Sequence, residues 1–189
     1  MKQTYSTRKL AYLGLMTALV FASNYARIVM PISIGGNTAF TLANIVCCLA
    51  GLLLGPIGGL ASGLGSALYD LTNPVYAAEC WITFLTKGAM GLVAGAVAFG
   101  LLKREGHRYG KYLFSGILGC VAYYILYFLK TFLISGLFAE EGSAALGMVA
   151  ILGKIPASVF NAAVAILVAP PLAIALEKAL EKAGLRLES

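Results

Sequence analysis

The chain has 189 residues, of which 60% are hydrophobic and 12% are charged, and its formal net charge is +6. Its mean hydropathy is +0.86, and a soluble domain would carry about twice this charged fraction. These values exclude an ordinary soluble domain and favour a single integral membrane domain over residues 1–189. The positive charge does not indicate nucleic-acid binding, because the basic residues lie at the ends of apolar segments, as the topology of a membrane protein requires.

Apolar segments follow one another at lengths typical of membrane-spanning helices, which need about 20 apolar residues. The first segment follows basic residues, as in a signal peptide, but it is too long for one and we interpret it as a retained helix. The second and third are short and are separated only by Gly55-Pro56, so a single long kinked helix is the alternative. We predict an all-α bundle of six transmembrane helices, at about residues 10–30, 40–54, 57–71, 80–102, 112–137 and 146–176.

The distribution of Lys and Arg favours six spans over five. With six spans, the basic N-terminal segment, the basic loop at residues 103–111 and the basic C-terminal tail all lie on one side, and Glu140 and Glu141 lie on the other. With five spans the basic loop would lie outside the cell, against the positive-inside rule. We therefore expect both termini in the cytoplasm.

Glycines recur every four residues from Gly51 to Gly63, and further glycines at 88, 91 and 95 mark one face of the fourth helix. Small residues at such spacing let helix backbones approach closely, so we expect close packing within the bundle. The four cysteines, at positions 47, 48, 80 and 120, lie in apolar segments without the spacing of metal ligands. We expect buried, reduced thiols and no metal site.

The sequence lacks the motifs of the enzyme classes that a membrane protein of this size could represent. It has no Gly-x-x-x-x-Gly-Lys-Ser/Thr phosphate loop, no His-Glu-x-x-His and no Gly-x-Ser-x-Gly, and its only histidine, His107, lies in the basic loop. The chain is therefore not expected to hydrolyse ATP itself. We predict that it is not an enzyme and needs no cofactor.

Three lysines lie within the predicted helices, and each belongs to a polar stripe at helical spacing. A charge within the bilayer costs several kcal/mol unless it faces a cavity or a partner, so such residues indicate a ligand or ion site. With six spans, all three stripes lie in the middle or outer half of the bilayer, which predicts a site open to the outside. The stripes are Glu79, Thr83 and Lys87; Tyr123, Tyr127 and Lys130; and Lys154, Ser158 and Asn161.

Each of these stripes also has a structural alternative. Lys130 and Lys154 are close enough to helix ends for their amino groups to reach the outer interface, whereas Lys87 is deeper and is better explained by a site. Asp70 and Glu79 could pair with the lysines and hold the helices together. Trp81 is either an interfacial residue or a platform for a flat ring. Such a site suits a polar molecule with a flat ring and partial negative charge.

Several segments of the chain form a pattern with a known counterpart. They are residues 42–44, 53–59 and 63–70, followed by Pro74-Val75-Tyr76 and by Thr83-Phe84-Leu85-Thr86-Lys87-Gly88. They resemble the substrate-binding S components of energy-coupling factor (ECF) transporters, most closely the riboflavin/hydroxymethylpyrimidine-type group. The resemblance covers nearly the whole chain and is most specific over residues 55–91. It implies a subunit of a prokaryotic plasma membrane that captures a water-soluble vitamin or precursor from outside, with riboflavin, hydroxymethylpyrimidine or a pyridoxine-like heteroaromatic favoured.

The resemblance also implies partners. S components dock on a transmembrane T component that carries two ABC ATPases, through small residues of the first helix, and Gly14, Ala18 and Ala22 have the required spacing here. Two other classes of function stay open. One is a stand-alone small transporter or channel that uses the intramembrane Lys, Asp and Glu residues and needs no ATPase. The other is a scaffolding subunit, in which the charges only hold helices together.

Overall fold

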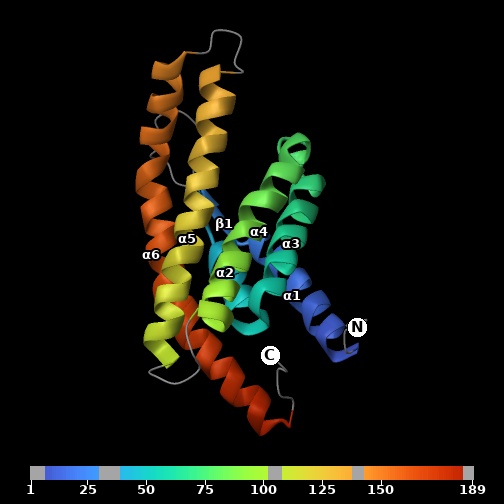
Figure 1. Ribbon diagram of the computed structural model, residues 1–189. Coiled ribbons are helices and arrows are strands. Elements are labelled where there is room, and N and C mark those ends of the chain that lie inside the picture. The colour runs from blue at the N-terminus through green and yellow to red at the C-terminus, as the bar shows by residue number, and fades with distance from the viewer. Residues whose placement is uncertain (1–6, 30–38, 102–107, 138–142, 185–189) are drawn as a thin grey trace.

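The computed structural model describes residues 7–29, 39–101, 108–137 and 143–184. Within these ranges the chain is almost entirely helical (Figure 1). Short 3₁₀ segments follow α2 and precede α4, and the chain continues beyond α4 and α5 in five-residue π segments. The elements are α1 (Thr7–Tyr25), β1 (Arg27–Val29), β2 (Ala39–Thr41), α2 (Ala43–Leu54), α3 (Gly58–Thr72), α4 (Cys80–Ala96), α5 (Arg108–Phe132) and α6 (Ala144–Lys182).

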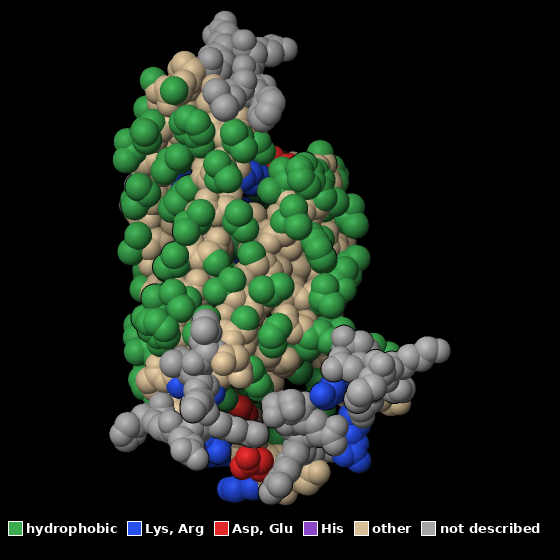
Figure 2. Space-filling model, in the orientation of Figure 1, with side chains coloured by type: hydrophobic (Ala, Val, Ile, Leu, Met, Phe, Trp, Pro, Cys, Tyr) green, Lys and Arg blue, Asp and Glu red, His purple; other side chains and the backbone are tan. Residues whose placement is uncertain are grey.

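The outer surface of the bundle is suited to a bilayer. Among the described residues, four helical stretches are long and apolar enough to cross a membrane: Ala43–Thr72, Ala77–Gly100, Arg108–Gly136 and Ala144–Lys182. The first of these contains both α2 and α3, and α1 is not among the four. Figure 2 shows hydrophobic side chains over most of the length of the bundle, most of the charged side chains at its lower end, and a few charged side chains between the helices in its upper part. The chain is therefore a membrane protein with an apolar belt.

The chain reverses its direction between α2 and α3, where the sequence left one kinked helix as an alternative. Gly55 has a φ of +69°, which glycine adopts without strain. The Ser62 hydroxyl donates a hydrogen bond of 3.1 Å to the carbonyl oxygen of Cys47, 15 residues earlier. In one continuous helix these residues would be about 22 Å apart, at 1.5 Å per residue. The two short helices therefore pack side by side as a hairpin.

Glycines let α4 pack directly on this hairpin. A Cβ atom added to Gly51 would lie 2.3 Å from the carbonyl oxygen of Gly91, and one added to Gly95 would lie 2.2 Å from the backbone of Gly55. These separations leave no room for any side chain. The glycine rows therefore serve close packing within the bundle, as their spacing indicates.

The first helix is shorter than predicted. Residues 10–30 were expected to be helical, but α1 ends at Tyr25, and Arg27–Val29 pairs antiparallel with Ala39–Thr41. The β-branched Ile28 and Val29 favour an extended backbone, and β2 also hydrogen bonds to a side chain of α6, described below. The all-α prediction is therefore corrected by one small sheet. Residues 30–38, between the strands, lie outside the described residues.

The basic ends of three helices lie together. The first turn of α1, the first turn of α5 and the last turns of α6 are at the same end of the bundle, the lower end in Figure 1. The basic residues of these turns include Arg8, Lys9, Arg108, Lys178 and Lys182. The lysines of the polar stripes lie away from these basic turns, with Lys130 near the end of α5 and Lys154 in the first third of α6. His107, Glu140 and Glu141 are outside the described residues.

Candidate functional site

A polar cavity of about 250 Å³ lies within the bundle. It is bounded by α4, α5 and α6, and residues of α1, α2, α3 and the small sheet complete its wall. Nine of the ten residues predicted as substrate contacts line it: Glu79, Thr83, Lys87, Tyr123, Tyr127, Lys130, Lys154, Ser158 and Asn161. The helical stripes thus converge on one space. Their contact with a ligand stays a prediction.

Trp81 is the predicted site residue that does not line the cavity. Its side chain is 61% exposed on the outside of α4. It lies two positions after Glu79, which is about 200° around a helix of 3.6 residues per turn. The stripe that directs Lys87 into the cavity therefore directs Trp81 away from it. Its position suits the interfacial alternative better than a platform for a ligand.

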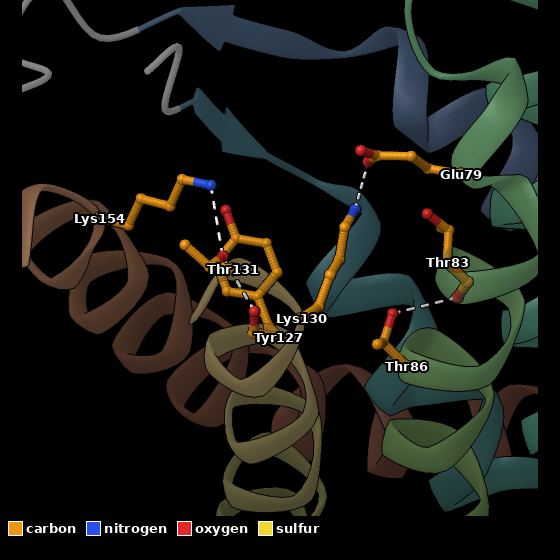
Figure 3. Close-up of polar contacts among 7 residues, drawn as sticks. All are labelled: Glu79, Thr83, Thr86, Tyr127, Lys130, Thr131 and Lys154. Atoms are coloured by element: carbon orange, nitrogen blue, oxygen red, sulfur yellow. Dashed lines mark hydrogen bonds and ion pairs between the residues drawn. The ribbon is translucent and has the colours of Figure 1, made fainter. Parts of the chain in front are cut away.

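Lys130 forms an ion pair in the cavity. Its Nζ atom donates to Oε2 of Glu79, which joins α5 to the start of α4 (Figure 3). The side chains are 19% and 37% exposed, respectively, so solvent screens this pair only in part. Glu79 is therefore the partner of Lys130 and not of Lys87.

Lys87 is the deepest cation of the cavity, with 6% of its surface exposed. Its ammonium group donates to Oδ1 of Asn44 on α2 and lies 4.5 Å from the ring centroid of Tyr123 on α5. The amide nitrogen of Asn44 in turn donates to the hydroxyl of Tyr124, at 3.3 Å. The ring faces and the amide oxygen are favourable partners for a cation. A polar chain thus crosses from α4 to α2 and α5.

Lys154 reaches the cavity from α6. Its Nζ atom donates a hydrogen bond of 3.3 Å to the hydroxyl of Thr131 and lies 5.4 Å from the ring centroid of Tyr127. Figure 3 shows Thr131 and Tyr127 between the amino groups of Lys154 and Lys130. The side chain is half-buried. Lys154 therefore points into the protein, and does not extend along the outer surface toward lipid.

Tyrosines of α5 form an aromatic wall. The rings of Tyr123 and Tyr127 are stacked, with centroids 5.7 Å apart and planes at 21°. Tyr124 meets both of them edge-on, at 4.7 and 6.3 Å. All three residues line the cavity. Such a wall offers both flat apolar faces and hydroxyl groups, which is the combination that a heteroaromatic ligand needs.

Asn161 makes its hydrogen bonds to the protein backbone, which is not typical of a residue that contacts a ligand. Its Oδ1 atom accepts the backbone N–H of Thr41 at 3.1 Å. Its Nδ2 atom donates to the carbonyl oxygens of Ala39 and Ala157, both at 2.9 Å. Two of these three hydrogen bonds hold β2 against α6, and the third returns to the backbone of α6 itself. Asn161 borders the cavity chiefly as the residue that positions its strand wall.

Several lining residues were not predicted from the sequence. Asn44, Tyr76 and Tyr124 line the cavity, and the guanidinium of Arg27 lies 5.0 Å from the ring centroid of Tyr76. Asn44 did carry a signal, since it is an isolated amide in a strongly apolar segment, and such a residue needs a partner in a bilayer. The tyrosines carried none, because tyrosine is common at membrane interfaces.

The site has the chemistry of a binding pocket. Lysine, threonine, asparagine and tyrosine side chains provide hydrogen bonds and aromatic faces around a small volume. Within the part of the chain that the structure describes, no group of three or more His, Cys, Asp or Glu residues could hold a metal ion. The arrangement can bind and orient a small polar molecule.

The predicted docking face on α1 is accessible. Gly14, Ala18 and Ala22 are all exposed, and a Cβ atom added to Gly14 would meet nothing within 4 Å. The other side of α1 packs inward through Met16 and Val20. The small-residue row is therefore not used for packing within the described bundle. Its contact with a partner stays a prediction.

Comparisons with known proteins agree with this architecture. Residues 4–178 match the family model of the ECF-type riboflavin transporter S component. A solved structure described as the S component of a bacterial ECF transporter has a TM-score of 0.63 at 16% identity, over 92% of this chain and 98% of that one. At this identity the likeness shows a shared fold alone. A search of curated proteins finds no match.

Proposed function

The chain belongs to the family of S components of ECF-type riboflavin transporters, and from this premise we propose that it captures a water-soluble vitamin or vitamin precursor for import. Members of this family are substrate-capture subunits of ECF transporters, not enzymes. The observation that carries the proposal for this chain is the cavity of about 250 Å³, which is polar although the bundle around it is apolar. Polar groups at membrane depth are costly unless they serve a ligand or a partner.

The favoured ligand is a flat heteroaromatic molecule. The stacked Tyr123 and Tyr127 provide ring faces, and the lysines and threonines provide hydrogen bonds to ring substituents. Riboflavin, hydroxymethylpyrimidine and a pyridoxine-like heteroaromatic, free or in a carboxylated or phosphorylated form, are the candidates. Pockets for drug-sized ligands occupy roughly 300–1,000 Å³, so a cavity of about 250 Å³ favours the two single-ring candidates.

The proposed topology has six spans, with both termini in the cytoplasm of a prokaryotic cell and the chain in its plasma membrane. The reversal between α2 and α3 supports two short spans in place of one long helix. The shared position of the basic turns of α1, α5 and α6 supports an even number of crossings. Under the positive-inside rule this basic end is cytoplasmic, and the cavity then faces the outside.

The proposed partners are a transmembrane T component and two ABC ATPases. The exposed row of Gly14, Ala18 and Ala22 supports docking through α1, because small residues let a partner helix approach closely. The distribution of charge supports capture over a stand-alone channel. Away from the basic helix ends, the charged residues of the described helices line one cavity, whereas a relay across the bilayer would need them at successive depths.

Two measurements test the proposal. First, mass spectrometry should identify a small heteroaromatic molecule that copurifies with the protein, and calorimetry should show that the purified chain binds it. Second, uptake of that molecule by cells that produce the chain should require the T component and active ATPases. Uptake that persists without the ATPases would support the stand-alone transporter instead, and absence of any small-molecule binding would contradict the proposal.

A further inference from the structure

We propose that the molecule captured by this chain carries a carboxylate or phosphate group, and that Lys154 binds this group where α5 and α6 face the cavity. The inference rests on the proposed function and deepens it, because it names the charge of the substrate and the residue that recognises it. Three features of the cavity support it: the balance of charge, the partners that each lysine already has, and the geometry around Lys154.

The balance of charge in the cavity is positive. Six of its lining residues are of types that carry a charge at neutral pH: the four basic residues Arg27, Lys87, Lys130 and Lys154, and the two acidic residues Asp70 and Glu79. The cavity lies in a bundle whose outer surface is apolar (Figure 2). An excess of positive charge in such surroundings is costly without a counter-charge.

The lysines differ in how far this charge is already matched. Lys130 pairs with Glu79, and Lys87 donates to the amide oxygen of Asn44 and lies 4.5 Å from the ring centroid of Tyr123. Lys154 forms no ion pair among the described residues. Its hydrogen bond goes to a hydroxyl group, that of Thr131, and its ring contact, at 5.4 Å, is longer than the 4.5 Å contact of Lys87. Of the three lysines, Lys154 is therefore the one whose charge has the weakest partners.

The geometry around Lys154 leaves room for an anion to bind. An ammonium group has three N–H donors, and the structure gives that of Lys154 one hydrogen bond, to Thr131. Its other contact is with the ring of Tyr127, whose centroid lies 5.4 Å away. A carboxylate or phosphate oxygen can accept the remaining N–H groups while the ring of the same molecule lies along the tyrosine wall. Charge-assisted hydrogen bonds of this kind are stronger than neutral ones.

A lipid headgroup is the other source of a phosphate near the outer end of α6. The anion is assigned to the captured molecule and not to lipid, because the Lys154 side chain is half-buried and turned toward Thr131 and Tyr127 of α5. A lysine that served lipid would instead extend along the outer surface of its helix.

Three matched pairs of probes test the inference on the purified full-length chain: nicotinamide and nicotinate, hydroxymethylpyrimidine and its monophosphate, and riboflavin and riboflavin 5′-phosphate. Calorimetry should show that, in at least one pair, the charged member binds at least tenfold more tightly than the neutral one. Lys154→Gln should remove that preference by weakening the charged member at least tenfold, with little change for the neutral member. Lys178→Gln, at an exposed site near the other end of α6, is the matched control and should retain the preference.

Two results would overturn the inference. One is a neutral member that binds as tightly as its charged counterpart in every pair that binds. The other is an unchanged preference in Lys154→Gln, which would assign Lys154 to lipid or to a structural role. If none of the probes binds, these rings are the wrong ligands and the proposed function is weakened. The electrophoretic mobility of the copurified molecule at neutral pH then decides the inference, since an anion supports it and a neutral molecule overturns it.

Discussion

Replacement of Lys87 by methionine tests whether this lysine binds the ligand or only holds helices together. The side chain is 6% exposed and contacts Asn44 and Tyr123. Methionine keeps nearly the same length and volume, so the substitution removes the charge without opening a cavity. Lys87→Ala would remove packing as well and would confound the two effects.

The expected effect on stability is small because two terms oppose each other. The variant loses a hydrogen bond to a charged group, about 1.5–3 kcal/mol, and a cation–π contact of about 0.5–2 kcal/mol. It gains the several kcal/mol that desolvation of a buried ion costs. No ion pair joins Lys87 to a carboxylate among the described residues, so no second charge is left alone. We expect the melting temperature of the ligand-free protein to change by only a few degrees.

The expected effect on binding is large. If the ammonium group contacts the captured molecule, its loss should weaken binding at least tenfold, which is about 1.4 kcal/mol. Both quantities are measured on the same purified variant, with calorimetry for the copurified molecule and a thermal melt for the protein. Lys178→Met is the control. An unchanged affinity would show that Lys87 does not contact the ligand. A large drop in melting temperature with normal binding by the folded fraction would show that its role is structural.

Three further outcomes follow from the proposed topology, docking face and glycine packing. In intact cells, an impermeant thiol reagent should label Ser143→Cys and should not label Arg108→Cys, because these positions lie at opposite ends of the bundle. Ala18→Trp should abolish uptake and copurification of the T component while ligand binding by the isolated chain stays within about threefold, since a large side chain blocks the approach of a partner helix. Gly51→Ala should destabilise the protein by about 1–3 kcal/mol, seen as a lower melting temperature, because its Cβ would lie 2.3 Å from a carbonyl oxygen of α4.

Two of these experiments have matched controls. Leu129→Trp, on the exposed side of α5, should leave uptake intact, and an equal loss of binding and uptake in Ala18→Trp would mean that α1 packs internally. Gly110→Ala, where a Cβ meets nothing within 4 Å, should leave the melting temperature unchanged. A stable Gly51→Ala variant would contradict the close packing of α2 on α4. Labelling of position 108 alone would contradict the proposed orientation.

The helices could be predicted from the sequence because the signal for them is local. A run of apolar residues long enough to cross a bilayer stands out from its neighbours alone, and this holds for the segments that became α4, α5 and α6. The polar stripes could be predicted for the same reason, since Lys87, Lys130 and Lys154 each interrupt an apolar helix. Their convergence on one cavity followed from the helical repeat and the topology together. The family resemblance, carried by residues 55–91, pointed to the same segments.

Pairing of Glu79 with one of the lysines was an alternative that the sequence allowed, but which polar groups meet could not be predicted, because they come from distant parts of the chain. Lys130 pairs with Glu79 across 51 residues, and Lys87 bonds to Asn44 across 43. The same holds for β1 and β2: a three-residue strand is too short to form from the preferences of its own residues alone, and it forms because it pairs with another strand and, in β2, with Asn161 of α6. A local sequence determines which segments enter the membrane and which faces are polar. Only the packing of the helices decides which polar groups meet, because hydrogen bonds and ion pairs depend on distances that the tertiary structure sets.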